Sequence, residues 1–449
     1  MTGDLTKGRV FPLLVRFTLP LILGNLLQLT YNAVDSIIVG RFVGAKALAA
    51  VAGSNPVVTL VILFEQGICL GAGILIGTLY GAKQYEKLRR QVATGLTAGF
   101  AFSSACAVLI AVLAPFIMRL LQADAAFYDL AVLYLRIVSA GLIFNFIYNY
   151  YASVLRAMGD SKSPLLFLGV SAGLNVLGDL FFIVVLHLGA AGAAIATVTA
   201  EALSGFLCAW YVRKRFPELE EHSLKDFDPQ LMRTTLSYGL TSALQQCTVQ
   251  MGKIGIQGIV NTMGVAATAA FGAVNRADDL TMVVEQNIGH AMTSVMAQNK
   301  GAGKKDRMKE AFFWGMVLEV VYGVLCAFVF FLLAEPIMGL FVREPEVIEV
   351  GTGYLRLIAF MYILPALTNG IQGYFRGIGD LRITLVSSLM NMATRVLAAI
   401  PLVFIFHMGM DAIPWSYMVG WFCMMLYEVP FLVRAMRDGG TGKGDADGV

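Results

Sequence analysis

Arg156-Ala-Met-Gly-Asp160 and Arg376-Gly-Ile-Gly-Asp380 are two copies of one motif, and the offset of 220 positions between them decides the fold. With the same offset, Tyr134-Leu-Arg136 aligns with Tyr354-Leu-Arg356. The alignment runs along both halves of the chain and needs only a one-residue slip near the start. The chain is therefore an internal duplication, and duplicated membrane proteins commonly move a substrate through the seam between their repeats.

The composition indicates an integral membrane protein. Hydrophobic residues make up 57% of the 449 residues and charged residues only 14%, whereas about 25% of the residues of a soluble domain are charged. The net charge of +3 is too small to indicate nucleic acid as a partner. The six cysteines lie inside apolar runs without metal-like spacing, so we expect buried free thiols and no bound cofactor.

Runs of about 20 apolar residues predict transmembrane helices. Twelve such runs are present, near residues 12–39, 47–79, 91–116, 128–152, 164–187, 190–212, 232–260, 267–297, 310–334, 347–372, 383–407 and 411–435. The runs are continuously apolar, which excludes the alternating pattern of a β-barrel. The predicted fold class is therefore all-α integral membrane, with twelve transmembrane helices in two parallel, pseudo-symmetric six-helix lobes.

The predicted lobes meet at a polar segment in the middle of the chain. Residues 1–220 form the N-terminal lobe with helices 1–6, and residues 221–449 form the C-terminal lobe with helices 7–12. The linker is expected at about residues 213–231. The tail at about residues 438–449, rich in Gly and Asp, is expected to be disordered.

The distribution of Lys and Arg predicts the orientation. With the N-terminus inside, the outer loops hold only Arg41, Lys46, Arg119 and Arg343 of the 33 Lys and Arg residues. This bias predicts a multi-pass protein of the cytoplasmic membrane with both termini cytoplasmic. No cleavable signal peptide is expected, because the polar segment at residues 1–9 leads directly into a run that is long enough to span.

Polar residues that differ between the repeats are the best candidates for chemistry, because shared positions serve the common fold. Asp35 falls opposite Ile254 or Gly255, Asn175 opposite Arg395, Asp179 opposite Ala399, and Thr197 opposite Tyr417. A carboxylate at the centre of a membrane helix costs about 2.5–3.5 kcal/mol. Asn175 and Asp179 are four residues apart and share a helix face, so we predict a polar cluster in the first half.

Such a cluster suits a small cation. Carboxylate, amide and hydroxyl oxygens are hard ligands that suit Na⁺, by analogy with other hard cations. Two neighbouring buried carboxyls also favour sharing a proton. The alternative is that these residues are polar contacts between helices, and Thr197 in particular commonly bonds the backbone of its own helix. The coupling ion, H⁺ or Na⁺, stays open.

The second half has a different asymmetry. Of the 21 methionines, all but Met1, Met118 and Met158 lie there, and flexible Met side chains suit a surface that binds many apolar shapes. Methionine that simply fills core and lipid-facing space is the alternative. The candidate substrate cavity comprises Asn32, Gln245, Gln246, Met251, Met282, Asp278, Asp279 and Met361. For Asp278 and Asp279, a salt bridge to Lys253, Arg276 or Arg395 is the competing interpretation.

The chain resembles the multidrug and toxic compound extrusion (MATE) family over essentially its whole length. The residues that carry the resemblance are Pro20-Leu-Ile-Leu-Gly-Asn25, Asn32-Ala-Val-Asp-Ser36, Gly44-Ala-Lys-Ala-Leu48, Gly81-Ala-Lys83, Arg156-Ala-Met-Gly-Asp160, Asn175-Val-Leu-Gly-Asp179 and Gln298-Asn-Lys-Gly301. The resemblance implies two six-helix lobes and a coupling-cation site in the N-terminal lobe, at positions that match Asp35, Asn175, Asp179 and Thr197. Leu244-Gln-Gln-Cys-Thr248 contains no carboxylate, which makes the chain more similar to the branch of the DNA-damage-inducible protein F.

The sequence therefore predicts a transporter and not an enzyme. We expect a monomeric multidrug efflux antiporter that exports amphipathic or cationic organic compounds, drugs or metabolites, in exchange for H⁺ or Na⁺ by alternating access. The first helix, weakened at Pro20 and Gly24, is expected to bend when Asp35 and Asp179 bind the cation. Alternatives are a lipid-linked saccharide flippase, a narrow-substrate metabolite exporter and, less in keeping with the residues, a membrane enzyme or a passive channel.

Overall fold

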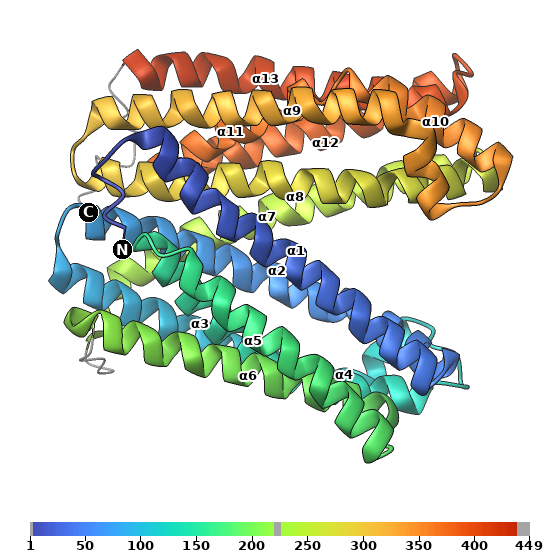
Figure 1. The fold of residues 1–449 in the computed structure, drawn as a ribbon, viewed down its shortest axis with the longest axis horizontal. Helices are drawn as coiled ribbons and strands as arrows, with labels where there is room; N and C mark the ends of the chain where they lie inside the picture. The colour runs from blue at the N-terminus through green and yellow to red at the C-terminus, as the bar shows by residue number, and fades with distance from the viewer. Residues whose placement is uncertain (1–2, 220–225, 438–449) are drawn as a thin grey trace. The chain divides into compact units, whose positions relative to one another are not determined.

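The computed structural model describes residues 3–219 and 226–437, and these residues form helices joined by short turns, without a β-strand (Figure 1). The predicted disordered tail, 438–449, lies outside the described residues. The chain divides into two compact units. Unit 1 comprises Met1–Asp4 and Leu19–Ala243, and unit 2 comprises Leu5–Thr18 and Leu244–Val449. Both units are thus built from segments that are distant in sequence, and α1 and α7 each contribute to both.

Unit 1 is organised around one buried helix. Its elements are α1 (Val10–Phe42), α2 (Ala45–Gly81), α3 (Tyr85–Leu120), α4 (Tyr128–Ala157), α5 (Lys162–Asp179), the π-helix η1 (Leu180–Val185), α6 (Gly189–Arg215), the short η2 (Pro217–Leu219) and the first part of α7 (Pro229–Asn261). α4 packs against α2, α3 and α6. Phe146, Tyr150 and Leu155 of α4 are fully buried at these contacts, so apolar burial between helices holds the unit together.

Unit 2 has a similar helical core. Its elements are the rest of α7, α8 (Val265–Gly301), α9 (Lys305–Phe341), α10 (Pro345–Ala359), α11 (Ile363–Ile378), α12 (Leu381–Phe404), η4 (Gly409–Asp411) and α13 (Ala412–Arg437). α8 packs against α9, α10 and α11, and α12 packs against α13. Phe271, Phe330, Tyr354 and Tyr362 lie in the core of this unit.

The duplication is visible in the backbone. α2 and α8 each have 37 residues, and the glycines that precede them, Gly44 and Gly264, have φ angles of 106° and 100°. Gly159 and Gly379, in the repeated motif, have φ angles of 87° and 83°. Glycine adopts positive φ without the steric cost that a Cβ atom brings. The two halves therefore turn in the same way at matching positions, as the repeat predicts.

The tenth predicted span, 347–372, is wrong as a single helix. α10 ends at Ala359, α11 begins at Ile363, and the two axes differ by 53°. Pro365 lies in the first turn of α11, where proline can begin a helix but cannot donate a hydrogen bond back to the preceding turn. The corresponding residue of the first half is Asn145, which lies inside the continuous helix α4. The presence of proline in the second half only therefore explains why only that half has a break. The fifth predicted span, 164–187, corresponds to one span, Lys162–Val185, in which α5 continues as the π-helix η1 after Asp179.

Most helices are suited to a bilayer. Within the described ranges, nine helices are long and apolar enough to cross a membrane, and the bent pair α10–α11 makes a tenth. α7 and α8 are of similar length but more polar, and α8 carries Arg276, Asp278, Asp279, Glu285 and His290. The prediction of an all-α, multi-pass membrane protein is confirmed.

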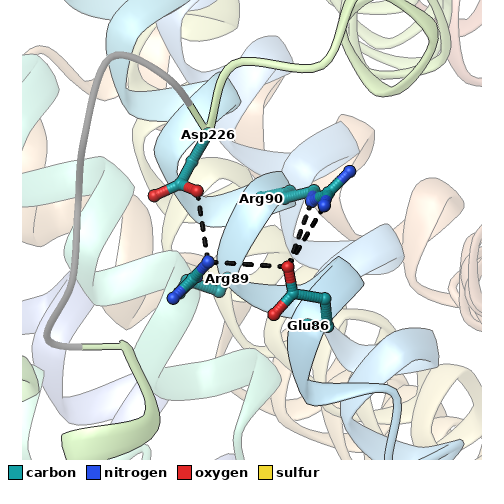
Figure 2. A network of polar contacts seen from close by, with 4 residues as sticks. All are labelled: Glu86, Arg89, Arg90 and Asp226. Atoms are coloured by element: carbon teal, nitrogen blue, oxygen red, sulfur yellow. Dashed lines mark hydrogen bonds and ion pairs between the residues drawn. The ribbon is translucent and has the colours of Figure 1, made fainter.

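The described end of the predicted linker, which follows residues 220–225, contacts unit 1 through an ion pair. Asp226 contacts Arg89 of α3, with 3.2 Å between carboxylate oxygen and guanidinium nitrogen. Glu86, one turn before Arg89 and Arg90, forms ion pairs with both of these arginines at 3.5 and 3.2 Å. Figure 2 shows the four side chains as one network that joins the segment before α7 to the start of α3.

Candidate functional site

Unit 1 brings together the four residues predicted to form a cation site. Asp35 comes from α1, Asn175 and Asp179 from the last turn of α5, and Thr197 from α6. Asp179 is fully buried and Asn175 is 2% exposed. The carboxyl groups of Asp35 and Asp179 lie close enough to each other to interact electrostatically. Side chains from α1, α5 and α6 thus lie side by side in this part of unit 1.

This site has more hydrogen-bond acceptor oxygens than hydrogen-bond donors. Asn175 Nδ2 donates to Thr197 Oγ1 at 3.4 Å, and Thr197 Oγ1 donates to the carbonyl of Ala193 at 3.1 Å. Thr197 thus bonds its own helix and also serves the cluster. In the described part of the chain, no donor reaches either carboxylate oxygen of Asp179, Oδ1 of Asp35 or Oδ1 of Asn175. Buried acceptors of this kind are costly unless they receive a proton or a cation.

The backbone around Asp179 is irregular. Asp179 ends α5, and the next six residues form the π-helix η1. Directly after η1, Leu186 N donates to the carbonyl of Phe181 at 3.0 Å. Segments of π-helix are rare and frequently occur at functional sites. Just before it, Gly178 lets α5 approach α6, because a Cβ atom there would lie 3.1 Å from Cβ of Ala196. The tight contact and the wide turn together position Asp179 beside α6.

A third acid, which was not among the predicted site residues, lies next to this cluster. Glu201 lies on α6, four residues after Thr197, and accepts a hydrogen bond from Asn145 Nδ2 at 2.8 Å. Tyr31, four residues before Asp35 on α1, lies within electrostatic range of both Asp35 and Glu201. The repeat contained the signal, since Glu201 falls opposite Trp421. We call Asp35, Asn175, Asp179, Thr197 and Glu201 the acidic pocket.

The corresponding positions of unit 2 hold a basic side chain and two aromatic rings in place of the polar and acidic side chains of unit 1. Arg395, the repeat mate of Asn175, lies with its guanidinium carbon 3.8 Å from the ring centroid of Tyr417 and 5.1 Å from that of Trp421. These two aromatic residues are the mates of Thr197 and Glu201. A cation–π stack, which is favourable when desolvated, thus occupies positions that hold carboxyl, amide and hydroxyl groups in unit 1.

The residues predicted to line a substrate cavity differ in their exposure. Asn32 and Gln246 are exposed on α1 and α7. Met251 is 73% exposed, Met361 is buried in the core of unit 2, and Met282 packs partly against that core. These methionines therefore include both surface and core positions.

Three polar candidates of unit 2 have partners within the unit. Gln245 is buried and donates to Gln372 and Ser388 at 3.1 and 3.0 Å. Asp278 accepts a hydrogen bond from the hydroxyl of Tyr362 at 2.5 Å. Asp279 forms an ion pair with Lys253 at 3.0 Å, and both side chains are more than half exposed. Asp279 therefore has an ion-pair partner of the kind that the competing interpretation expected, and its contact with substrate stays a prediction.

The candidates for bending lie in an uninterrupted helix. Pro20 is inside α1, which runs without a break from Val10 to Phe42. A proline there removes one hydrogen bond to the preceding turn. A Cβ atom on Gly24 would lie 3.8 Å from Leu165 Cδ1, which is ordinary contact, so packing in this conformation does not require glycine at that position.

Comparison with known proteins gives a consistent result. The profile of the MatE family matches residues 20–181 and 242–403, one stretch in each half. The chain is 30% identical over 403 residues to the probable multidrug resistance protein YpnP of Bacillus subtilis (strain 168), covering 86% of this chain and 87% of that one. It is 31% identical over 375 residues to YoeA, a second probable multidrug resistance protein of the same organism, covering 81% and 80%. A crystal structure of MATE in the bent conformation superposes with a TM-score of 0.91 at 22% identity, covering 98% and 100%.

Proposed function

Because the chain belongs to the MatE family of membrane transporters, we propose that it is a multidrug efflux antiporter driven by H⁺ or Na⁺. It exports amphipathic or cationic organic compounds from the cytoplasm by alternating access. The relatives YpnP and YoeA, named as probable multidrug resistance proteins, support this substrate class. The bias of Lys and Arg supports a cytoplasmic location of both termini.

The observation that carries the proposal is that Asp35 and Asp179 lie close enough to interact electrostatically, while three of their four carboxylate oxygens have no donor among the described residues. Two neighbouring carboxyl groups repel if both are ionised, and they become compatible when a proton or a metal cation lies between them. The amide of Asn175 and the hydroxyl of Thr197 add neutral oxygens on the same side. We propose that the driving cation binds here and that Glu201 is a further carboxyl on its route.

The acidic pocket also links cation binding to backbone motion. Asp35 lies on α1, and Asp179 lies at the junction between α5 and the π-helix η1. Occupation by a cation removes the repulsion between the two carboxyls and draws the helices together. α1 then bends near Pro20, where one backbone hydrogen bond is already missing. Each cation state thus favours a different shape of α1, which is what an exchange mechanism requires.

The test is export by purified protein in liposomes. Ethidium movement is measured under an imposed pH gradient and then under a Na⁺ gradient, for the wild type, Asp35→Asn and Asp129→Asn. Asp129 is exposed in the first turn of α4, so its substitution is the matched control. We expect Asp35→Asn to lose gradient-driven flux while the control keeps it. Wild-type flux in Asp35→Asn would refute the proposal, and the effective gradient identifies the ion.

A further inference from the structure

Unit 2 contains three fully buried acids that no part of the proposed function uses. Glu285 of α8, Glu319 of α9 and Glu428 of α13 are each 0% exposed. They lie in the interior of their helices, away from the polar ends. A buried carboxylate costs several kcal/mol unless a cation or hydrogen-bond donors compensate for lost water, so each of the three needs a compensating partner.

One basic side chain serves this group. Arg376 of α11 is 8% exposed, and it interacts electrostatically with Glu428 and less strongly with Glu319. Its Nη2 donates to Gln372 Oε1 at 3.1 Å, whereas its Nε has no acceptor in the described part of the chain. A single guanidinium carries one positive charge. It can therefore neutralise only one of the acids. Its electrostatic interaction is stronger with Glu428, although neither carboxylate oxygen of Glu428 has a hydrogen-bond partner among the described residues.

Of the remaining two acids, Glu285 has a donor and Glu319 has none. Asn369 Nδ2 donates to Glu285 Oε2 at 3.1 Å. Within the described residues, neither carboxylate oxygen of Glu319 has a hydrogen-bond partner. The charged groups that act on Glu319 are Glu285 from α8 and Arg376 from α11, and the phenol of Tyr322 lies near it on α9 itself. Glu285 and Glu319 repel if both are ionised.

Two glycines on neighbouring helices lie next to the side chain of Glu319, so helix backbone and no other side chain faces it at these two positions. A Cβ atom on Gly289 of α8 would lie 3.9 Å from Glu319 Oε1, and one on Gly370 of α11 would lie 3.6 Å from its Cγ. In unit 1 the position of Glu319 is taken by Gly99, against which the ring of Phe146 packs. The same fold thus forms in unit 1 without an acid at this position, so the fold does not by itself require Glu319.

We propose that Glu319 is a second proton-binding site of the protein, located in unit 2 and separate from the acidic pocket. A buried acid without a cation or donor takes up a proton in preference to keeping its charge. This site goes beyond the proposed antiport function and gives unit 2 its own response to pH.

The first test compares Glu319→Gln with Glu310→Gln. Glutamine has the shape of a protonated glutamate, and Glu310 is an exposed acid on the same helix. An acid that keeps its proton in the folded state but releases it on unfolding makes the protein less stable as the pH rises. We therefore expect the melting temperature in detergent to fall by several degrees less between pH 5.5 and 8.5 in Glu319→Gln than in wild type and Glu310→Gln. Equal falls in all three proteins would overturn the proposal.

The second test uses the wild-type protein, in case Glu319→Gln does not fold. Dicyclohexylcarbodiimide reacts with protonated carboxyls in apolar surroundings, and mass spectrometry of the peptide that contains Glu319 detects the adduct. We expect an adduct at pH 5.5 that decreases as the pH rises, and the same adduct in Asp35→Asn. No adduct at any pH, or its loss in Asp35→Asn, would overturn a separate proton site. Neither measurement requires transport, so failure of the antiport proposal would be recognised independently.

Discussion

Replacing Thr197 with valine tests whether the hydroxyl of the acidic pocket contributes to cation binding. Thr197 Oγ1 accepts from Asn175 at 3.4 Å and donates to the carbonyl of Ala193 at 3.1 Å. Valine keeps the shape of the side chain and removes both interactions. Thr199, two residues later on α6, is exposed and bonds only its own helix through the carbonyl of Ile195 at 2.7 Å. Thr199→Val is therefore the matched control.

The expected magnitude follows from the geometry. A neutral hydrogen bond contributes about 0.5–1.5 kcal/mol, and the distance of 3.4 Å between Asn175 and Thr197 argues for the lower part of that range. Loss of the bond also leaves the buried amide of Asn175, whose Oδ1 has no donor among the described residues, less well oriented. A total of about 1 kcal/mol corresponds to roughly a fivefold change in binding.

The assay is ethidium export from liposomes at graded concentrations of the driving cation. In Thr197→Val we expect the half-saturating Na⁺ concentration to rise about fivefold, or the half-maximal pH to move by about 0.7 unit if protons drive export. Thr199→Val should behave like the wild type. An unchanged cation dependence in Thr197→Val, with full expression and stability, would refute the assignment of Thr197 to the site. An equal change in both variants would indicate a general effect on α6.

Two further substitutions test the packing and the surface charges. Gly67→Ala brings a Cβ atom to 2.6 Å from the carbonyl oxygen of Gly239, and this overpacking costs about 1–3 kcal/mol. Gly173→Ala meets nothing within 4 Å, so Gly67→Ala should melt at a clearly lower temperature, and equal melting temperatures would contradict the argument. Asp279→Asn removes the exposed ion pair with Lys253 at 3.0 Å, worth less than about 1 kcal/mol. We expect little change in melting temperature at low or high salt and unchanged ethidium export, and a loss of export would instead assign Asp279 to the substrate.

The helices were predictable because apolar runs mark them, but their ends and interruptions were less so. The predicted span 47–79 corresponds to α2, Ala45–Gly81, whereas 310–334 falls short of α9, Lys305–Phe341, at both ends. Charged residues at the start of α9 are helical although they are not apolar, so hydropathy does not register them. The break before α11 interrupts a run that stays apolar, and only the chemistry of Pro365 reveals it.

Residue spacing predicts the pairs in the acidic pocket only within one helix, and the grouping of residues from different helices came only from the family resemblance. Asn175 and Asp179 share a face because they are four residues apart. The contact of Glu201 with Asn145 joins α6 to α4, and no spacing rule anticipates it. The comparison of the two halves identifies Glu201 opposite Trp421 and also Glu319 opposite Gly99. The sequence therefore identifies the acids that have no acidic residue at the corresponding position of the other half. The side chains that contact these acids become known only from the structure.

The duplication offers an internal control for function. Both halves form the same turns, with positive φ at Gly159 and Gly379. Where unit 1 has Asp179, unit 2 has Ala399, and its helix α12 still runs through that position. A carboxyl there is thus unnecessary for the helix, although placing it in a membrane costs about 2.5–3.5 kcal/mol. Since the fold forms without that carboxyl in unit 2, cation binding is the better explanation for it in unit 1. By the same reasoning, Asp179→Ala should leave the protein folded and remove cation-driven export.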